Sequence, residues 1–119
     1  MLHASDPQLC RRGEIWMVDL GLNVGHEQSK IRPALVISEG PWMQRGEITT
    51  VVPITSRSRQ GVPSRIPIAP PEGGLVVAGD VLADQVRTVS TQRLLRLMGM
   101  ASGSTLERVG HVVRTLLGL

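Results

Sequence analysis

The chain has 119 residues, 41% of them hydrophobic and 19% charged, a balance that is typical of one globular domain and excludes a disordered protein. Its 13 basic and 10 acidic residues give a net charge of +3, which permits nucleic-acid binding without requiring it. The single cysteine, Cys10, excludes an intrachain disulfide, and no apolar run is long enough to span a bilayer, so we expect a cytoplasmic location.

The N-terminal part of the chain predicts a tail, a strand and a loop. Residues 1–10 lack periodicity, so we expect a flexible tail followed by one domain of residues 11–119. The alternation in EIWMVDL at 14–20 predicts a strand that is buried on at least one side. Glycine and asparagine residues then predict a long loop over 21–32.

Two further strands are predicted on either side of a turn. PALVIS at 33–38 and TTVVPIT at 49–55 are apolar and rich in β-branched residues. The glycine-bracketed residues 40–46 predict the turn between them. Pro53 lacks the N–H group that a sheet ladder needs, so it predicts an edge or a bulge in the third strand.

The second half of the chain alternates loops with short strands. SRSRQGVPSR at 56–65 predicts an exposed basic loop, and the IPIAP that follows predicts a short edge strand before a turn at PPEGG. Residues 76–90 predict one or two strands, interrupted around Gly79 and Asp84. Residues 91–100 fit either a helical turn followed by a strand or one short helix.

The last segment has the periodicity of an amphipathic helix. Ser104 with Glu107 three residues later has the form of a capping box, and Ser102 is an alternative cap. Gly110 indicates a close packing contact, because glycine inside a helix costs about 1 kcal/mol relative to alanine. The apolar face that we expect to join the core comprises Leu106, Val109, Val113, Leu116 and Leu117.

Together these elements predict a mainly β (α+β) domain, a small antiparallel barrel followed by a C-terminal helix. Trp16 and Trp42 are its only aromatic residues, which disfavours the stacking of several bases on aromatic rings. We expect Trp16, in the first strand, to be a core residue, and Trp42 to be the more exposed of the two.

Four short segments carry side chains that could act chemically: GHEQ at 25–28, RP at 32–33, PITS at 53–56 and DQVRT at 84–88. Each also has a structural interpretation. Glu27 can pair with a nearby basic residue in a surface salt bridge, and Thr55 can belong to a strand-end turn. Asp84 can form a structural ion pair with Arg87.

In their order and spacing, RRGEIWMVDL, GHEQSKIRPALVIS, VVPITS and VLADQVRT resemble the MazF/PemK (Kid) family of toxins from toxin–antitoxin pairs. The resemblance runs from Arg12 to the C-terminal helix. It implies an SH3-like barrel that forms a homodimer and cleaves single-stranded RNA at short sequence motifs without a metal or other cofactor. It also implies a cognate antitoxin that neutralises the toxin.

The resemblance assigns catalysis to Arg32 and Thr55. The residues that it places along the same groove are His26, Glu27, Gln28, Asp84 and Gln85. Leu82 stands where some relatives carry an additional catalytic arginine, so the assignment of acid and base in those relatives does not transfer whole.

Cleavage by attack of the 2′-OH group on phosphorus needs a base, an acid and a cation, and these residues can supply them. The guanidinium of Arg32 can hold two phosphate oxygens, and Pro33 restricts Arg32 to extended backbone angles that help to aim it. The base is Glu27 or His26, with Asp84 as a further candidate. The further side chains predicted to contact RNA are Lys30, Ser56, Arg57, Arg59 and Arg87.

Two other functions fit the same architecture. CcdB-type toxins poison DNA gyrase without cutting RNA, and they carry a tryptophan-containing C-terminus, whereas this chain ends in LLGL. A catalytically inactive RNA-binding barrel is the other alternative, and the presence of both Arg32 and Thr55 argues against it.

Overall fold

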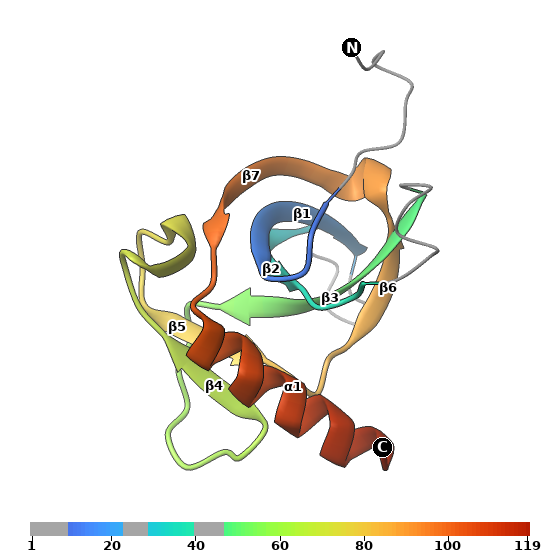
Figure 1. Cartoon of the computed structure of the whole chain (residues 1–119). Coiled ribbons are helices and arrows are strands. Elements are labelled where there is room, and N and C mark those ends of the chain that lie inside the picture. Colours follow the sequence, from blue (N-terminus) through green and yellow to red (C-terminus); the bar gives the residue numbers. More distant parts are fainter. Residues whose placement is uncertain (1–9, 23–28, 40–46) are drawn as a thin grey trace.

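The structure is a computed structural model that describes residues 10–22, 29–39 and 47–119. Within these residues seven antiparallel strands form one sheet, which curves into a small open barrel, and an α-helix follows at the C-terminus (Figure 1). The predicted fold class, mainly β with a C-terminal helix, is confirmed. Predictions for residues 1–9 and 40–46 lie outside the described residues.

The strands are joined in the order β4-β5-β3-β2-β1-β7, and β6 pairs with β3 beside β5. Two short 3₁₀ helices, η2 and η3, interrupt the second half. The elements are β1 (Glu14–Leu22), β2 (Ser29–Val36), β3 (Ile48–Thr55), β4 (Arg65–Ile68), η2 (Glu72–Gly74), β5 (Gly79–Leu82), β6 (Arg87–Ser90), η3 (Thr91–Arg93), β7 (Leu94–Met100) and α1 (Gly103–Leu117).

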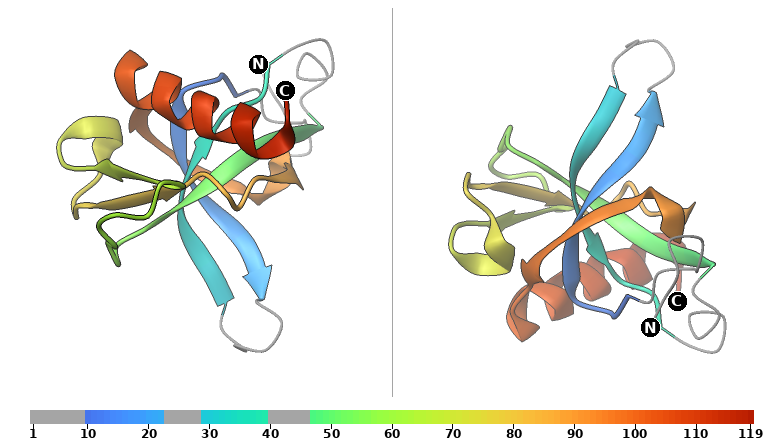
Figure 2. Two further views of the ribbon diagram at one scale, coloured as in Figure 1. Left: turned by 90° about the horizontal axis from the view of Figure 1, so that it is seen from below. Right: turned by 90° about the horizontal axis from the view of Figure 1, so that it is seen from above.

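The predicted loop over 21–32 is wrong at both of its ends. β1 continues to Leu22, and β2 begins at Ser29, so that Ile31 and Arg32 pair with β1 across an antiparallel ladder. Ile31 is 55% exposed, so the apolar residue in this part of the strand is not buried in the core. The far ends of β1 and β2 project from the barrel on the side opposite α1 (Figure 2).

Most other predicted elements are confirmed, with local corrections. Residues 76–90 form two strands, and Gly79 begins β5 instead of interrupting a strand. For residues 91–100 the first alternative holds, a helical turn (η3) followed by a strand (β7). β4 is an edge strand, as its prolines predict. Pro53 is no edge residue, since β3 is central, but it stands at the end of the ladder between β2 and β3.

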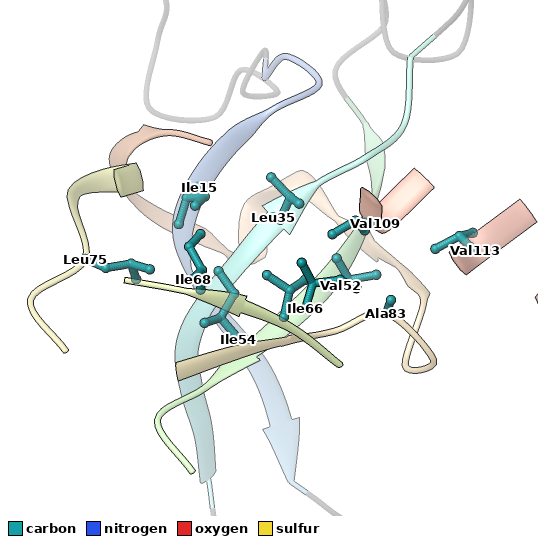
Figure 3. Packing of buried hydrophobic residues seen from close by; sticks show 11 residues of the cluster. Ile15, Leu35, Val52, Ile54, Ile66, Ile68, Leu75, Ala83, Val109 and Val113 are labelled. Carbon is teal, nitrogen blue, oxygen red and sulfur yellow. The ribbon is translucent and has the colours of Figure 1, made fainter. Parts of the chain in front are cut away.

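The hydrophobic core has two clusters, one on each face of the curved sheet. The first contains Leu35, Val52 and Ile66, and Val109 of α1 packs on it (Figure 3). The second contains Trp16, which is 8% exposed and confirms the predicted core position. Cys10 also belongs to this second cluster, and burial raises the pKa of its thiol although a hydrogen bond with Thr49 opposes the change.

No ladder among the described strands joins β4 to β7, and η2, which follows β4 along the chain, contacts β7. A Cβ atom on Gly74 would overlap the carbonyl oxygen of Met98 in β7, so only glycine permits this close approach. Glu72 accepts a hydrogen bond from the backbone N–H of Ser102 at 2.8 Å, which ties η2 to the start of α1. Burial alone would raise the pKa of Glu72, but hydrogen bonds from Ser102 and Thr105 outweigh it and hold the pKa below its ordinary value.

Ser102, not Ser104, is the N-cap of α1. Its side chain accepts from the backbone N–H of Thr105 at 3.1 Å, and the predicted capping box at Ser104 is wrong because that residue already lies inside the first turn. Val109 and Val113 are buried as expected. Leu116 and Leu117 are 54% and 57% exposed, so the expected apolar face joins the core only along its first part. No helix in the described ranges is long and apolar enough to cross a membrane.

Gly110 makes no close packing contact, contrary to the sequence prediction. A Cβ atom there would meet only the guanidinium groups of Arg114, at 3.2 Å, and Arg12, at 3.7 Å, and both side chains are flexible. We therefore expect Gly110→Ala to raise the free energy of unfolding by about 0.5–1 kcal/mol in urea denaturation. Gly118→Ala is the matched control, because the φ of +75° at this C-cap is unfavourable for alanine and should make the same change destabilising. A loss of stability in Gly110→Ala would contradict the prediction.

Candidate active site

Arg32 and Thr55 leave the ladder between β2 and β3 at the same end. The last recorded pair of this antiparallel ladder is Ala34 with Pro53. Arg32 lies two residues before Ala34 and Thr55 two residues after Pro53, so an ideal continuation of the register would set the two opposite one another. Two residues that are distant in the sequence therefore stand at the same end of one ladder.

Pro33 explains why the ladder ends beside these two residues. Ile37 donates its backbone N–H to the carbonyl oxygen of Thr50 at 3.0 Å, so Leu35 and then Pro33 follow as the positions of this strand that face β3. Pro33 has no N–H and cannot donate to Ile54, its expected partner. The two strands thus lose their hydrogen bonding just before Arg32, where a substrate could approach.

Three of the predicted site residues share one face of the sheet. Side chains alternate between faces along a strand, so Arg32 lies on the face of Ala34, a member of the second core cluster. Thr55 lies on the face of Val51 for the same reason, and Arg87 of β6 is the direct partner of Val51. Arg32 and Thr55 are partly exposed and Arg87 is exposed, so all three border the point where this cluster ends.

Thr55 is fixed by a hydrogen bond to its side chain and by the pairing of its backbone with β5, and its hydroxyl proton is available to donate. Its Oγ1 accepts a hydrogen bond from the backbone N–H of Arg57 at 3.2 Å, which leaves the O–H group available. Its backbone pairs with Asp80 of β5. β5 can approach so closely because Gly79 has no side chain, since a Cβ atom there would overlap the carbonyl oxygen of Thr55.

The β3–β4 loop, residues 56–64, follows Thr55 directly and is exposed over residues 56–61, as predicted. Ser56, Arg57 and Arg59 all lie in this exposed part. Within the described part of the chain neither Arg57 nor Arg59 has an ion-pair partner for its guanidinium group. The loop lies on the same side of the barrel as the projecting ends of β1 and β2 (Figure 2).

Asp84 and Gln85 lie in the exposed turn between β5 and β6. The turn joins the two strands that pair with the same edge of β3, since β5 pairs beside Thr55 and β6 pairs beside Val51. It therefore follows the part of β3 that leads to Thr55. No ion pair joins Asp84 to Arg87, so the structural interpretation of these two residues is wrong.

The remaining predicted site residues stay predictions. His26, Glu27 and Gln28 lie outside the described residues, and so does the side chain of Lys30. Among the residues that are described, no three His, Cys, Asp or Glu side chains lie close enough together to hold a metal ion.

Comparison with known proteins connects this arrangement to a protein family. A family model described as PemK-like, MazF-like toxin of type II toxin–antitoxin system matches residues 11–117, nearly the whole chain. The chain belongs to this toxin family. The resemblance stated from the sequence motifs is thereby confirmed, and nothing supports the gyrase-poisoning alternative.

Individual relatives within the toxin family agree in sequence and in structure. Endoribonuclease MazF9 from Mycobacterium tuberculosis is 36% identical over 117 residues, which cover 93% of this chain and 98% of the relative. The crystal structure of MazF from Deinococcus radiodurans is 28% identical with a TM-score of 0.79, covering 94% of this chain and 99% of that one. A MazE–MazF structure from the same organism has a TM-score of 0.77 at 28% identity, covering 94% and 98%.

Sequence analysis missed the residues that hold the site in place. Asp80 is buried and pairs with Arg65, whose Nη1 lies 3.4 Å from its Oδ2, and Gly79 gives β5 its close approach to Thr55. The signal for Asp80 was present, because it is the only charged residue in the apolar stretch 75–83. Its partner was not visible, since Arg65 is 15 residues away and meets it only through the pairing of β4 with β5.

Proposed function

We propose that this member of the toxin family is an endoribonuclease that cuts single-stranded RNA at short sequence motifs and inhibits growth until a cognate antitoxin neutralises it. Relatives that are named endoribonucleases support this activity. The arrangement that supports the proposal is the position of Arg32 and Thr55 at the same end of the ladder between β2 and β3, each two residues beyond its last pair and on either side of the point where Pro33 interrupts the hydrogen bonding.

The reaction that fits these side chains is an internal transfer at phosphorus. The 2′-oxygen of one ribose forms a bond to the adjacent phosphorus while the bond from phosphorus to the 5′-oxygen breaks. A base removes the 2′-hydroxyl proton, and an acid protonates the departing 5′-oxygen. The products are a 2′,3′-cyclic phosphate and a 5′-hydroxyl end, and the balance requires no metal and no other cofactor.

Arg32 and Thr55 act on the non-bridging phosphate oxygens, where negative charge builds up in the transition state. The planar guanidinium of Arg32 holds two of these oxygens, and because a guanidinium is a poor proton donor, Arg32 serves mainly as a cation, with the role of the acid as the alternative. The hydroxyl of Thr55 donates a further hydrogen bond to the same phosphate. The general base belongs to the set of His26, Glu27 and Asp84.

The remaining predicted residues bind the rest of the RNA strand. Basic side chains contact phosphates, which gives affinity that falls as salt is added, and amide and hydroxyl side chains add hydrogen bonds. This set comprises Gln28, Lys30, Ser56, Arg57, Arg59, Gln85 and Arg87. None of these side chains is a tryptophan, and Trp16 is buried in the second core cluster.

The toxin acts as a homodimer that binds a cognate antitoxin protein. Support for the antitoxin comes from the MazE–MazF structure of Deinococcus radiodurans, whose toxin chain is similar to this one over nearly its whole length. The homodimer follows from the family resemblance of the sequence motifs.

The test of this function is to incubate the purified protein with a mixed RNA in excess EDTA and to map the fragment ends. We expect a limited set of cuts at one short motif, with 2′,3′-cyclic phosphate and 5′-hydroxyl ends. Addition of the antitoxin encoded with this chain should stop the cutting. Intact RNA, or cutting that EDTA abolishes, would contradict the proposal, and fragments with 5′-phosphate ends would contradict the mechanism.

A further inference from the structure

Asp80 is the only charged side chain that is buried in the described part of the chain, with 2% exposure. A buried charge is unfavourable unless it is paired and hydrogen-bonded, and even a well-made buried ion pair is a poor source of stability. Its hydrogen-bond partners therefore indicate what it does. They come from the β3–β4 loop and from β4, and none of them belongs to the core.

The carboxylate of Asp80 fixes the β3–β4 loop at two points. Its Oδ2 accepts directly from the backbone N–H of Arg59 at 2.8 Å. The same oxygen lies 3.4 Å from Nη1 of Arg65, which also donates to the carbonyl oxygen of Arg57 at 2.7 Å. Because Arg57 in turn donates its N–H to the Thr55 hydroxyl, one buried carboxylate connects the loop backbone to a catalytic residue.

The arginine side chains of the β3–β4 loop are exposed, whereas its backbone is held by hydrogen bonds. Arg57 and Arg59 have their backbone groups bonded, yet their side chains are exposed and have no carboxylate partner among the described residues. Such a pair of cations on an ordered backbone is suited to phosphate oxygens, since little conformational freedom remains to be lost on binding.

We propose that Asp80 and Arg65 are positioning residues that hold the β3–β4 loop beside Thr55. The held loop presents Arg57 and Arg59 to the backbone phosphates of RNA bound at the cleavage site. This inference rests on the proposed ribonuclease function and deepens it, because it assigns RNA affinity to a buried carboxylate and its partly exposed arginine partner, neither of which touches RNA.

The test compares Asp80→Asn with the double variant Arg57→Ala/Arg59→Ala and with all three changes combined. The amide keeps the shape of the carboxylate but loses its charge, so the loop should loosen while the fold persists. We expect the KM for a short RNA substrate to rise roughly tenfold in Asp80→Asn with kcat within about twofold, because phosphate contacts of this kind bind substrate and transition state alike. In the background without the two arginines, Asp80→Asn should add little.

Two controls separate positioning from a general structural role, and a second variant guards against failure to fold. Glu107→Gln makes the same change in charge on the exposed surface of α1 and should leave KM unaltered. Hydrogen exchange at the Arg59 amide should accelerate in Asp80→Asn without any RNA present. If Asp80→Asn fails to fold, Arg65→Lys takes its place in the same comparison, since it keeps the charge but loses the planar fork.

An equal rise in KM with and without the two arginines would overturn the inference, and so would a faster Arg59 exchange with an unchanged KM. Absence of any cleavage by the wild-type protein would overturn the proposed function itself. In that case the exchange measurement still shows whether Asp80 holds the loop.

Discussion

Arg32→Ala should reduce RNA cleavage by roughly 10³-fold or more in single-turnover assays, because an arginine that stabilises transition-state charge on a phosphate typically contributes that much. The partly exposed side chain forms no ion pair within the described part of the chain, so its loss should leave the thermal midpoint nearly unchanged. The effect should appear in kcat more than in KM, since negative charge on the phosphate grows as the reaction proceeds.

Two further variants test whether the effect is specific to the guanidinium group and to the position of Arg32. Arg32→Lys keeps the positive charge but cannot hold two phosphate oxygens in one plane, so its activity should lie between those of the wild type and the alanine variant. Arg108→Ala removes an exposed arginine from α1, on the opposite side of the barrel from the projecting strand ends, and should cleave normally (Figure 2). Full activity in a folded Arg32→Ala protein would remove Arg32 from the mechanism.

The position of Arg32 shows where sequence reasoning stops. The motif around Arg32 predicts a catalytic role, which stays a prediction, and the glycine and asparagine residues before it predict a loop where the structure has the strand β2. The sequence predicts that Pro33 aims the arginine. Its other effect, the missing hydrogen bond to β3, depends on which neighbouring strand each backbone N–H of β2 faces. That direction is fixed by the register of β2 with β3, which no local pattern in the sequence states.

The same limit applies to the supporting residues. Strands and turns followed from local composition, and both core valines of α1 followed from helical spacing. Ser102 and Ser104 are the same residue type, and both suit an N-cap position. Ser102 is the N-cap in the structure, where its backbone N–H also bonds to Glu72 of η2, 30 residues earlier. Asp80 likewise acquires its role only when β4 and β5 pair. Local signals thus predicted the elements, and contacts between elements decided the details of the site.

Thr55→Val should lower kcat by about 10²-fold to 10³-fold, the usual cost of losing one hydrogen-bond donor to a developing negative charge. Valine has nearly the shape of threonine and suits a strand, so β3 and its pairing with β5 should persist. Thr55→Ser restores the hydroxyl group and should recover most of the activity. Circular dichroism and thermal denaturation would confirm that each variant is folded.

The Thr55 hydroxyl has one role in the structure and another in the proposed mechanism, and the kinetics can separate them. In the structure it accepts the N–H of Arg57 at 3.2 Å, and in the proposed mechanism it donates to the phosphate. Loss of the donor role acts on the transition state and lowers kcat, whereas loss of the acceptor role loosens the β3–β4 loop and raises KM. Combining Thr55→Val with Arg57→Ala and Arg59→Ala removes the contribution of the two loop arginines. If Thr55→Val still lowers kcat relative to the double variant Arg57→Ala/Arg59→Ala, Thr55 acts on the transition state. If it no longer lowers kcat there, Thr55 serves only to anchor the loop.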